Sequence, residues 1–185
     1  FPLYRPNALG LSGWRPLFEK FASRAGEIDS GLGSLIQQEL GFLEHAWPTD
    51  LPEGVIHADL FPDNVFFIDE KLSGIIDFYF ACNDSLAYDI AVCLNAWCFD
   101  PDSEFEPSKG AALLQGYESV RPLSAKERQS MPTLARGAAM RFLLTRSYDW
   151  LNTPKDALVA RKDPADYIRR LAFHQSAASI ADYAP

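Results

Sequence analysis

Apolar residues recur at intervals of three and four along both ends of this chain, which is the spacing of one helix face. This pattern predicts five amphipathic helices, over residues 14–25, 32–47, 109–120, 125–151 and 164–181. Pro48 and Pro52 are expected to stop the second of them. Because Pro132 falls inside the fourth, we expect that stretch to be two helices or to begin again near the proline.

The middle of the chain has a different pattern, with short runs of β-branched and aromatic residues. These runs predict strands at 55–56, 65–68 and 72–76, with a turn at 69–71. Residues 86–99 are apolar on every face and carry few charges, which predicts a buried helix. We therefore expect an α+β fold, mainly α, in which a small β-hairpin is inset among helices.

Polar residues beside these strands form the most informative motif of the chain. His57, Asp59 and Asn64 are spaced as H-x-D-x-x-x-x-N, and Asp77 directly follows the third predicted strand. Phosphoryl-transfer enzymes of the kinase type arrange their catalytic loop and metal ligands in this way. We expect Asp59 to face the acceptor hydroxyl, and Asn64 and Asp77 to bind the magnesium ion that bridges the ATP phosphates. The competing interpretation is a surface hairpin with incidental acids and a buried His57.

Composition and charge narrow the possible classes. The 185 residues are 48% hydrophobic and 13% aromatic, which predicts a packed core rather than disorder. The net charge of −8 argues against a nucleic-acid partner, because phosphate contacts need a concentrated basic face. ATP remains compatible with this charge, since magnesium supplies local positive charge. No apolar run approaches the roughly 20 residues that span a bilayer, so we expect no membrane partner.

The three cysteines, Cys82, Cys93 and Cys98, lack C-x-x-C spacing and clustered histidines. They predict reduced thiols rather than a zinc site or a disulfide framework. No signal peptide is recognisable either. Together these features predict a cytoplasmic enzyme.

The motif and its surroundings resemble the aminoglycoside/choline phosphotransferase superfamily, whose fold is protein-kinase-like. This resemblance covers roughly residues 30–100 and is carried by GVIHADLFPDNV at 54–65, IDF at 76–78 and YDIA at 88–91. Three stretches further resemble the bacterial homoserine kinases of this fold: 57–64, 76–97 and 141–152. The resemblance implies ATP-dependent phosphorylation of the side-chain hydroxyl of L-homoserine, in threonine biosynthesis, with Mg²⁺ as the metal.

The resemblance also implies supporting roles. Asp89 matches an aspartate that braces the catalytic loop from the buried helix, and a carboxylate on so apolar a helix needs hydrogen-bond donors. His57 and Asp84 are expected to support the same loop. Phe66 and Ile76 match positions at the floor of the adenine site, although plain strand core would explain them equally well.

Homoserine is a zwitterion, so its carboxylate favours a guanidinium and its ammonium favours an acid. Arg141, Arg146 and Asp149 fall on one predicted helix, and Arg146 and Asp149 share a face at spacing three. Tyr79 and Asn83 follow Asp77, where an acceptor could reach. We expect these five residues to contact the substrate, with an intrahelical ion pair and ordinary packing as the alternative.

A complete kinase also needs an N-terminal lobe that holds the nucleotide phosphates with a Gly-rich loop and a strand lysine. No such segment is recognisable in this sequence. We therefore expect residues 1–185 to be the C-terminal lobe of a longer protein, with the N-terminal lobe of the same protein as its partner. Alone, this lobe is expected to be inactive.

Three other functions stay open. The first is a kinase of another small hydroxylated substrate, such as an aminoglycoside, choline or a sugar. The second is a non-catalytic pseudokinase or interaction module, which the intact Asp59, Asn64 and Asp77 disfavour. The third is a metal-dependent hydrolase, which lacks the additional histidine or aspartate ligands that a two-metal site needs.

Overall fold

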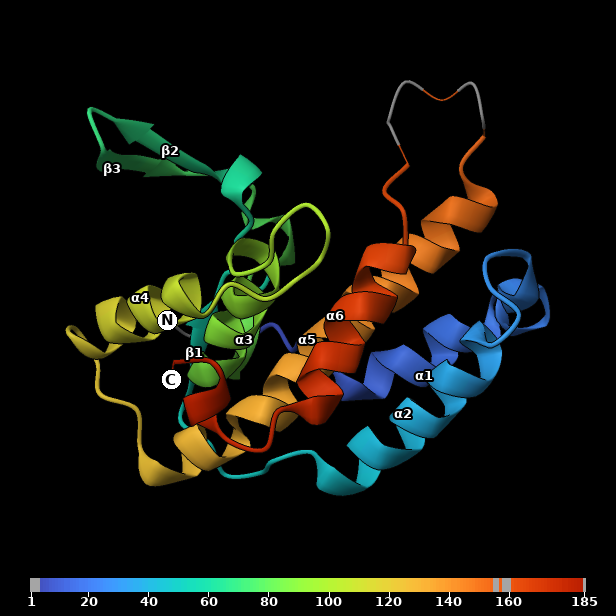
Figure 1. The fold of residues 1–185 in the computed structure, drawn as a ribbon, viewed down its shortest axis with the longest axis horizontal. Coiled ribbons are helices and arrows are strands. Elements are labelled where there is room, and N and C mark those ends of the chain that lie inside the picture. Colours follow the sequence, from blue (N-terminus) through green and yellow to red (C-terminus); the bar gives the residue numbers. More distant parts are fainter. Residues whose placement is uncertain (1–3, 155–156, 158–160, 185) are drawn as a thin grey trace.

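A computed structural model describes residues 4–154, 157 and 161–184 of the chain (Figure 1). The helices are α1 (Leu11–Glu19), α2 (Leu32–Ala46), α3 (Leu86–Trp97), α4 (Pro107–Glu118), α5 (Ala125–Asn152) and α6 (Ala165–Ser176). Four short 3-10 helices accompany them: η1 (Ala22–Glu27), η2 (Pro62–Asn64), η3 (Phe78–Phe80) and η4 (Ile180–Asp182). The strands are β1 (Glu53–Ile56), β2 (Val65–Ile68), β3 (Lys71–Ile75) and β4 (Cys82–Ser85). The predicted fold class, α+β and mainly α, is confirmed.

The strands form two separate antiparallel pairs, β1 with β4 and β2 with β3. Asp69 and Glu70 close the β2–β3 hairpin with φ values of 47° and 61°, the left-handed conformation that a two-residue hairpin turn requires. Strand β4 was not predicted, because Cys-Asn-Asp-Ser lacks β-branched and aromatic residues. The loop at 57–64 connects β1 to β2, and Asp77 lies between β3 and β4. Both loops therefore run between the two pairs of strands.

Two expected helices end at least five residues earlier than predicted, and the bounds of the others differ by one or two residues. The helix predicted over 14–25 ends at Glu19, because Phe21 leaves the helical region with φ −134° and ψ 4°. The helix predicted over 164–181 ends at Ser176, after which Ala177 is extended. Cys82, Cys93 and Cys98 are free and buried.

The expected interruption of α5 at Pro132 is wrong, because the helix runs unbroken through the proline. A capping box fixes its start: Ser124 Oγ accepts from the Glu127 N–H at 3.2 Å, and Glu127 accepts from the Ser124 N–H at 2.9 Å. Helix α5 also packs along α3 and α6 and in part against α1 and α2. This packing outweighs the cost of about 3 kcal/mol that an interior proline imposes.

Helix α5 runs through the middle of the helical body with α6 beside it, and the β2–β3 hairpin projects away from that body (Figure 1). Trp47 packs tightly on α5 at Gly137, where a Cβ atom would lie 2.2 Å from its ring. Trp47 itself packs edge-on against Trp14 with ring centroids 5.1 Å apart. Only glycine at position 137 leaves room for this aromatic pair.

A buried polar cluster joins α3, α6 and the C-terminal segment. His174 Nε2 lies 3.1 Å from Asn95 Oδ1, and its Nδ1 lies 3.0 Å from the Tyr183 hydroxyl. Asn95 donates in turn to the carbonyl oxygens of Ala91 and Ala135 at 2.9 and 3.1 Å. Burial lowers the pKa of His174 to about 3, so this ring is uncharged at neutral pH.

Candidate active site

The loop that carries Asp59 is held by a carboxylate in the first turn of α3. Asp89 Oδ2 accepts from the His57 N–H at 3.0 Å, and Asp89 Oδ1 accepts from the Ala58 N–H at 2.8 Å. This helix is otherwise largely buried and apolar, so the two backbone donors compensate for the desolvation of the carboxylate. Asp89 therefore fixes the start of the loop relative to the core.

His57 connects this loop to the segment that carries Asp77. Its Nδ1 accepts from the Asp59 N–H at 3.3 Å, and its Nε2 donates to the carbonyl oxygen of Ile76 at 2.9 Å. These partners place the ring hydrogen on Nε2. Both ring nitrogens are thus occupied by backbone groups, which is a structural arrangement rather than that of a proton carrier.

Asn64 makes a second connection between the same two segments. Its side-chain Nδ2 donates to the Asp59 backbone carbonyl oxygen at 2.8 Å, and its backbone carbonyl oxygen accepts from the Ile76 N–H at 3.0 Å. Ala58 and Asp77 both adopt the left-handed conformation with φ of 61°. Each such residue costs about 1–3 kcal/mol, which these hydrogen bonds offset. The two aspartates are thereby held in a fixed relation to Asn64.

Asp59, Asn64 and Asp77 line one cleft of about 390 Å³. Its opposite wall comes from α5, with Arg141, Arg146 and Asp149 among the lining residues. Six of the residues predicted from the sequence therefore come together around one space, although they are spread over more than ninety positions of the chain.

Asp59 is partly enclosed in this cleft, with 19% of its side chain exposed. Burial raises the pKa of its carboxyl above the ordinary value, the neighbouring Arg141 opposes this rise, and Asp77 adds to it. A carboxylate with a raised pKa is a stronger base, and this favours accepting a proton from a hydroxyl group.

The remaining charges of the cleft have both signs. Arg146 Nη1 lies 3.3 Å from Asp166 Oδ2, and the guanidinium lies 4.5 Å from the Tyr167 ring centroid. Burial raises the pKa of the nearby Asp149 carboxyl. Lys162 faces the same space and lies 3.9 Å from Asp63.

Lys162 was not predicted from the sequence to be a residue of the site. It stands in a short segment between α5 and α6 with no motif around it, and only the fold brings it to the cleft. Thr145 also lines the cleft, at a position on α5 that helical periodicity alone does not distinguish. No local signal could have identified either residue.

The oxygen donors of the cleft fit a magnesium ion. Asn64 uses its Nδ2 for the Asp59 carbonyl oxygen, and Asp77 accepts from the Tyr79 N–H at 3.4 Å. Among the described residues, Asn64 Oδ1 has no hydrogen-bond partner and Asp77 has no other side-chain contact of this kind. The described residues contain no group of three or more His, Cys, Asp or Glu side chains arranged to hold a metal. Mg²⁺ needs only one or two carboxylates when substrate phosphates and water complete its coordination.

Four residues that were predicted to contact the nucleotide or the substrate lie outside this cleft. Tyr79 is 71% exposed, and Phe66 and Ile76 are 51% and 48% exposed on the hairpin and just after it. Asn83 lies on β4, where its Oδ1 accepts from the Arg5 N–H at 2.9 Å. The structure gives none of the four a contact that assigns a role, and their roles stay predictions.

Asp84 also lies outside the cleft. Its Oδ2 accepts from Asn7 Nδ2 at 2.8 Å, and its Oδ1 accepts from the Ser85 N–H at 2.7 Å. Asp84 therefore holds the N-terminal stretch against β4 and makes no hydrogen bond to the loop at 57–64. Any support of that loop by Asp84 would be indirect.

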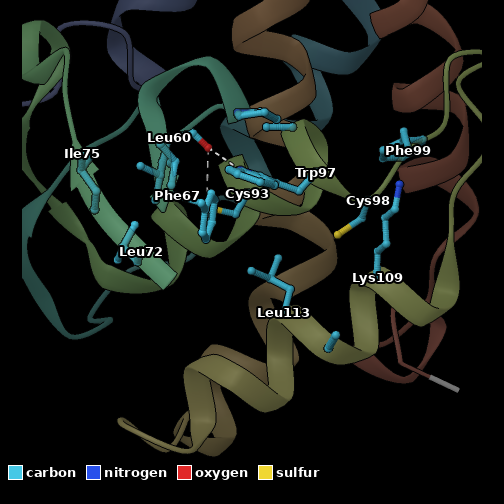
Figure 2. A pocket seen from close by; sticks show the side chains of 14 residues that line it. Leu60, Phe67, Leu72, Ile75, Cys93, Trp97, Cys98, Phe99, Lys109 and Leu113 are labelled. Carbon is cyan, nitrogen blue, oxygen red and sulfur yellow. Dashed lines mark hydrogen bonds between the residues drawn. The ribbon is translucent and has the colours of Figure 1, made fainter. Parts of the chain in front are cut away.

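A second and larger cavity, of about 640 Å³, lies between the β2–β3 hairpin, α3 and α4 (Figure 2). Phe67, Leu72 and Leu113 project toward it, and Lys109 is the one charged residue among the described residues that line it. At its back, the carbonyl oxygen of Leu60 accepts from Trp97 Nε1 at 2.8 Å. This contact ties the loop at 57–64 to α3 a second time, beside an apolar space.

Among the described residues, no helix combines the length and the apolar character needed to cross a membrane.

Comparison with known proteins agrees with this geometry. Homoserine kinases of Rhizobium meliloti (strain 1021) and Xanthobacter autotrophicus are 60% and 61% identical to the chain over 183 residues, which is 99% of its length. The chain spans 56% and 57% of these two relatives, a little over half of each.

Two solved structures share the fold. Plasmodium vivax ethanolamine kinase superposes with a TM-score of 0.64 at 16% identity, over 94% of this chain and 50% of that one. An aminoglycoside-3'-phosphotransferase of type VIII gives a TM-score of 0.54 at 21% identity, over 80% of this chain and 52% of that one. The sequence profile of the phosphotransferase enzyme family matches residues 1–123. The chain belongs to this phosphotransferase family.

Proposed function

We propose that the longer protein containing this chain phosphorylates the side-chain hydroxyl of L-homoserine with ATP and Mg²⁺, a step of threonine biosynthesis. The observation that carries the proposal is 60% identity to proteins named homoserine kinase over 99% of the chain. The convergence of Asp59, Asn64 and Asp77 on one cleft supports it. Because the chain spans little more than half of those relatives, the activity is proposed for the longer protein.

In this proposal Asp59 orients the acceptor hydroxyl and takes its proton as the oxygen attacks the γ-phosphate. Asn64 and Asp77 hold the metal, whose charge, when it is bound, offsets that of the phosphates. Asp89 and His57 keep these groups in register through the backbone contacts described above. The protein thus contributes position and charge rather than covalent chemistry.

The acceptor side of the cleft carries both signs of charge, which suits a zwitterionic amino acid. Arg146 and Lys162 could receive a carboxylate, and Asp149 could receive an ammonium group. Choline brings no carboxylate to these two cations, and a polycationic aminoglycoside would place like charges beside them. Kinases of those substrates are therefore the less favoured reading of the same site.

The nucleotide side is proposed from the exposed positions near the hairpin. Phe66 and Ile76 are half-exposed apolar side chains that line neither the cleft nor the apolar cavity. Apolar surface of this kind suits the face of an adenine ring. We assign both residues to the adenine floor.

We also propose that the partner is the remainder of the same polypeptide, which covers the exposed hairpin. Two-stranded hairpins are only marginally stable in water unless another layer covers them. Phe67 and Leu72 are nevertheless 56% and 60% exposed and face the cavity of Figure 2. Since the matched relatives are nearly twice as long as this chain, the additional sequence is the natural occupant of that cavity. Without it, this lobe is expected to be inactive.

The test is an activity screen of the full-length protein. ADP production would be measured with Mg-ATP and, in turn, homoserine, choline, an aminoglycoside and simple sugars. The proposal predicts the highest kcat/KM for homoserine. Preference for any other acceptor would keep the phosphotransferase and reject the substrate, and ATP hydrolysis independent of every acceptor would reject the kinase.

A further inference from the structure

Arg141 is an almost fully buried arginine in the middle of α5, with 2% of its side chain exposed. Both of its terminal nitrogens contact the loop at 57–64, which connects β1 to β2. Nη1 donates to the carbonyl oxygen of Ala58, and Nη2 lies 3.5 Å from Asp59 Oδ1. The guanidinium thus contacts the left-handed residue and the carboxylate that follows it.

The surroundings of this guanidinium hold it in place on two further sides. Its central carbon lies 4.5 Å from the centroid of the Phe142 ring and 5.2 Å from that of Phe80. Within the described part of the chain, its Nε has no hydrogen-bond partner. Burial of a cation with an unused donor is costly, and replacing buried ion pairs with apolar residues of similar volume is often neutral or stabilising. A role in function explains why the charge is tolerated.

We propose that Arg141 is a positioning residue, which holds the Ala58 carbonyl and Asp59 Oδ1 so that Asp59 presents Oδ2 to the acceptor hydroxyl. Asp59 Oδ2 has no hydrogen-bond partner among the described residues, and so this oxygen is available to a substrate. The inference rests on the proposed function in one respect, because the reaction in which Asp59 acts is the proposed phosphorylation.

This role differs from the substrate contact that the sequence predicted for Arg141. With 2% of its side chain exposed and both terminal nitrogens in contact with the loop, Arg141 offers little accessible guanidinium surface to a substrate carboxylate. Arg146, five positions further along α5, also lines the cleft and is the better candidate for that grip.

Arg136 offers a matched control on the same helix. It is 16% exposed and forms a bidentate pair with the buried Glu39, with both N–O distances 2.7 Å. This pair joins α5 to α2 and lies outside the cleft lining. Arg136→Met and Arg141→Met therefore each remove a paired arginine from α5, but of these two arginines only Arg141 contacts Asp59.

In the full-length protein, Arg141→Met should lower kcat about 10- to 100-fold while KM for ATP and homoserine changes less than about threefold. Arg136→Met should lower the melting temperature and leave kcat within about twofold. In an Asp59→Asn background, adding Arg141→Met should cause no further loss, because the two residues act as one unit. Arg141→Lys keeps one donor and serves as a second variant if Arg141→Met does not fold; it should show a smaller kcat loss with the same KM values.

Several results would overturn the role. A rise in KM for homoserine at constant kcat would make Arg141 a substrate ligand. A full additional loss on top of Asp59→Asn would make it independent of Asp59, and an unchanged kcat in folded Arg141→Lys and Arg141→Met would remove it from the mechanism. A wild-type protein that phosphorylates a different alcohol would refute the proposed substrate only, and the same comparison would then be made with that alcohol.

Discussion

The carboxylate of Asp89 lies against the backbone of Ala58 and accepts its N–H at 2.8 Å on Oδ1, while Oδ2 accepts the N–H of His57 at 3.0 Å. Through this relationship, a residue of the buried core sets the conformation of the residue before Asp59. Arg141 binds the same short segment from the other side, through the Ala58 carbonyl. The peptide groups on both sides of Ala58 are thus fixed by charged side chains.

Asp89→Asn should therefore disturb the position of Asp59, although Asp89 does not line the cleft. The amide retains one acceptor oxygen and sets an NH₂ group against a backbone N–H. We expect a loss of about 1–3 kcal/mol in unfolding free energy and a fall of about tenfold or more in kcat. Denaturant titration and steady-state kinetics measure both effects. Asp102→Asn, in an exposed loop, is the control and should change neither quantity.

Substitutions of the two cleft aspartates should affect different quantities: turnover for Asp59 and Mg-dependent ATP binding for Asp77. Asp59→Asn should lower kcat about 10²-fold or more and leave Mg-dependent ATP binding intact, because it removes the proton acceptor alone. Asp77→Ala should abolish the magnesium dependence of ATP binding. Calorimetric titration with and without Mg²⁺ distinguishes them. Wild-type Mg-ATP affinity in Asp77→Ala, or near-normal turnover in Asp59→Asn, would contradict the assignment.

The buried His174 should make the fold sensitive to mild acid. Its pKa is lowered to about 3 in the folded protein, against an ordinary value near 6.5. Between these two pH values the unfolded chain binds a proton that the folded chain does not, so stability is lost as the pH falls through this window. The slope is about 1.4 kcal/mol per pH unit for one proton.

Urea unfolding of the full-length protein between pH 7.5 and 4.5 measures this slope, with His174→Gln as the comparison. The variant loses the titrating group and should show a shallower dependence on pH, even if it is less stable at pH 7.5. An identical dependence in both proteins would mean that other groups control acid stability.

The apolar cavity beside the hairpin should be filled in the full-length protein. Leu72 and Ile68 are comparably exposed in this chain, at 60% and 66%, but only Leu72 lines the cavity. In the full-length protein, Leu72→Asp should cost about 2 kcal/mol or more, because it places a carboxylate against a covered apolar surface. Ile68→Asp should cost much less. Equal effects on the melting temperature would show that the two faces of the hairpin are covered alike.

The loop that carries Asp59 and Asn64 could be predicted from the sequence because its motif is local. The span from His57 to Asn64 forms one loop, and its hydrogen bonds to Asp89 and Ile76 involve residues that the same motif includes. The fold class was also predictable, since the apolar spacing of three and four is a direct property of helices. Helix α3 was expected to be buried, and most of its apolar residues are buried in the structure.

The rest depended on tertiary contacts that no local pattern encodes. Pro132 predicted a break in α5, yet the capping box at Ser124 and packing along α3 and α6 keep the helix continuous. Strand β4 exists because β1 pairs with it, and not because its residues favour strands. The approach of Arg141 to Asp59 across 82 positions, and of Lys162 to the cleft, could not be inferred from spacing.

The most direct test of the central claim compares L-homoserine with its carboxyl amide as acceptors of the full-length protein. The account predicts phosphorylation of homoserine with a kcat/KM about 10- to 150-fold above that of the amide, because the amide loses a charge-assisted contact worth about 1.5–3 kcal/mol. Arg146→Leu should narrow this ratio by raising KM for homoserine more than KM for ATP. Equal kcat/KM for homoserine and its amide would contradict recognition of a free carboxylate and leave only a kinase of small alcohols.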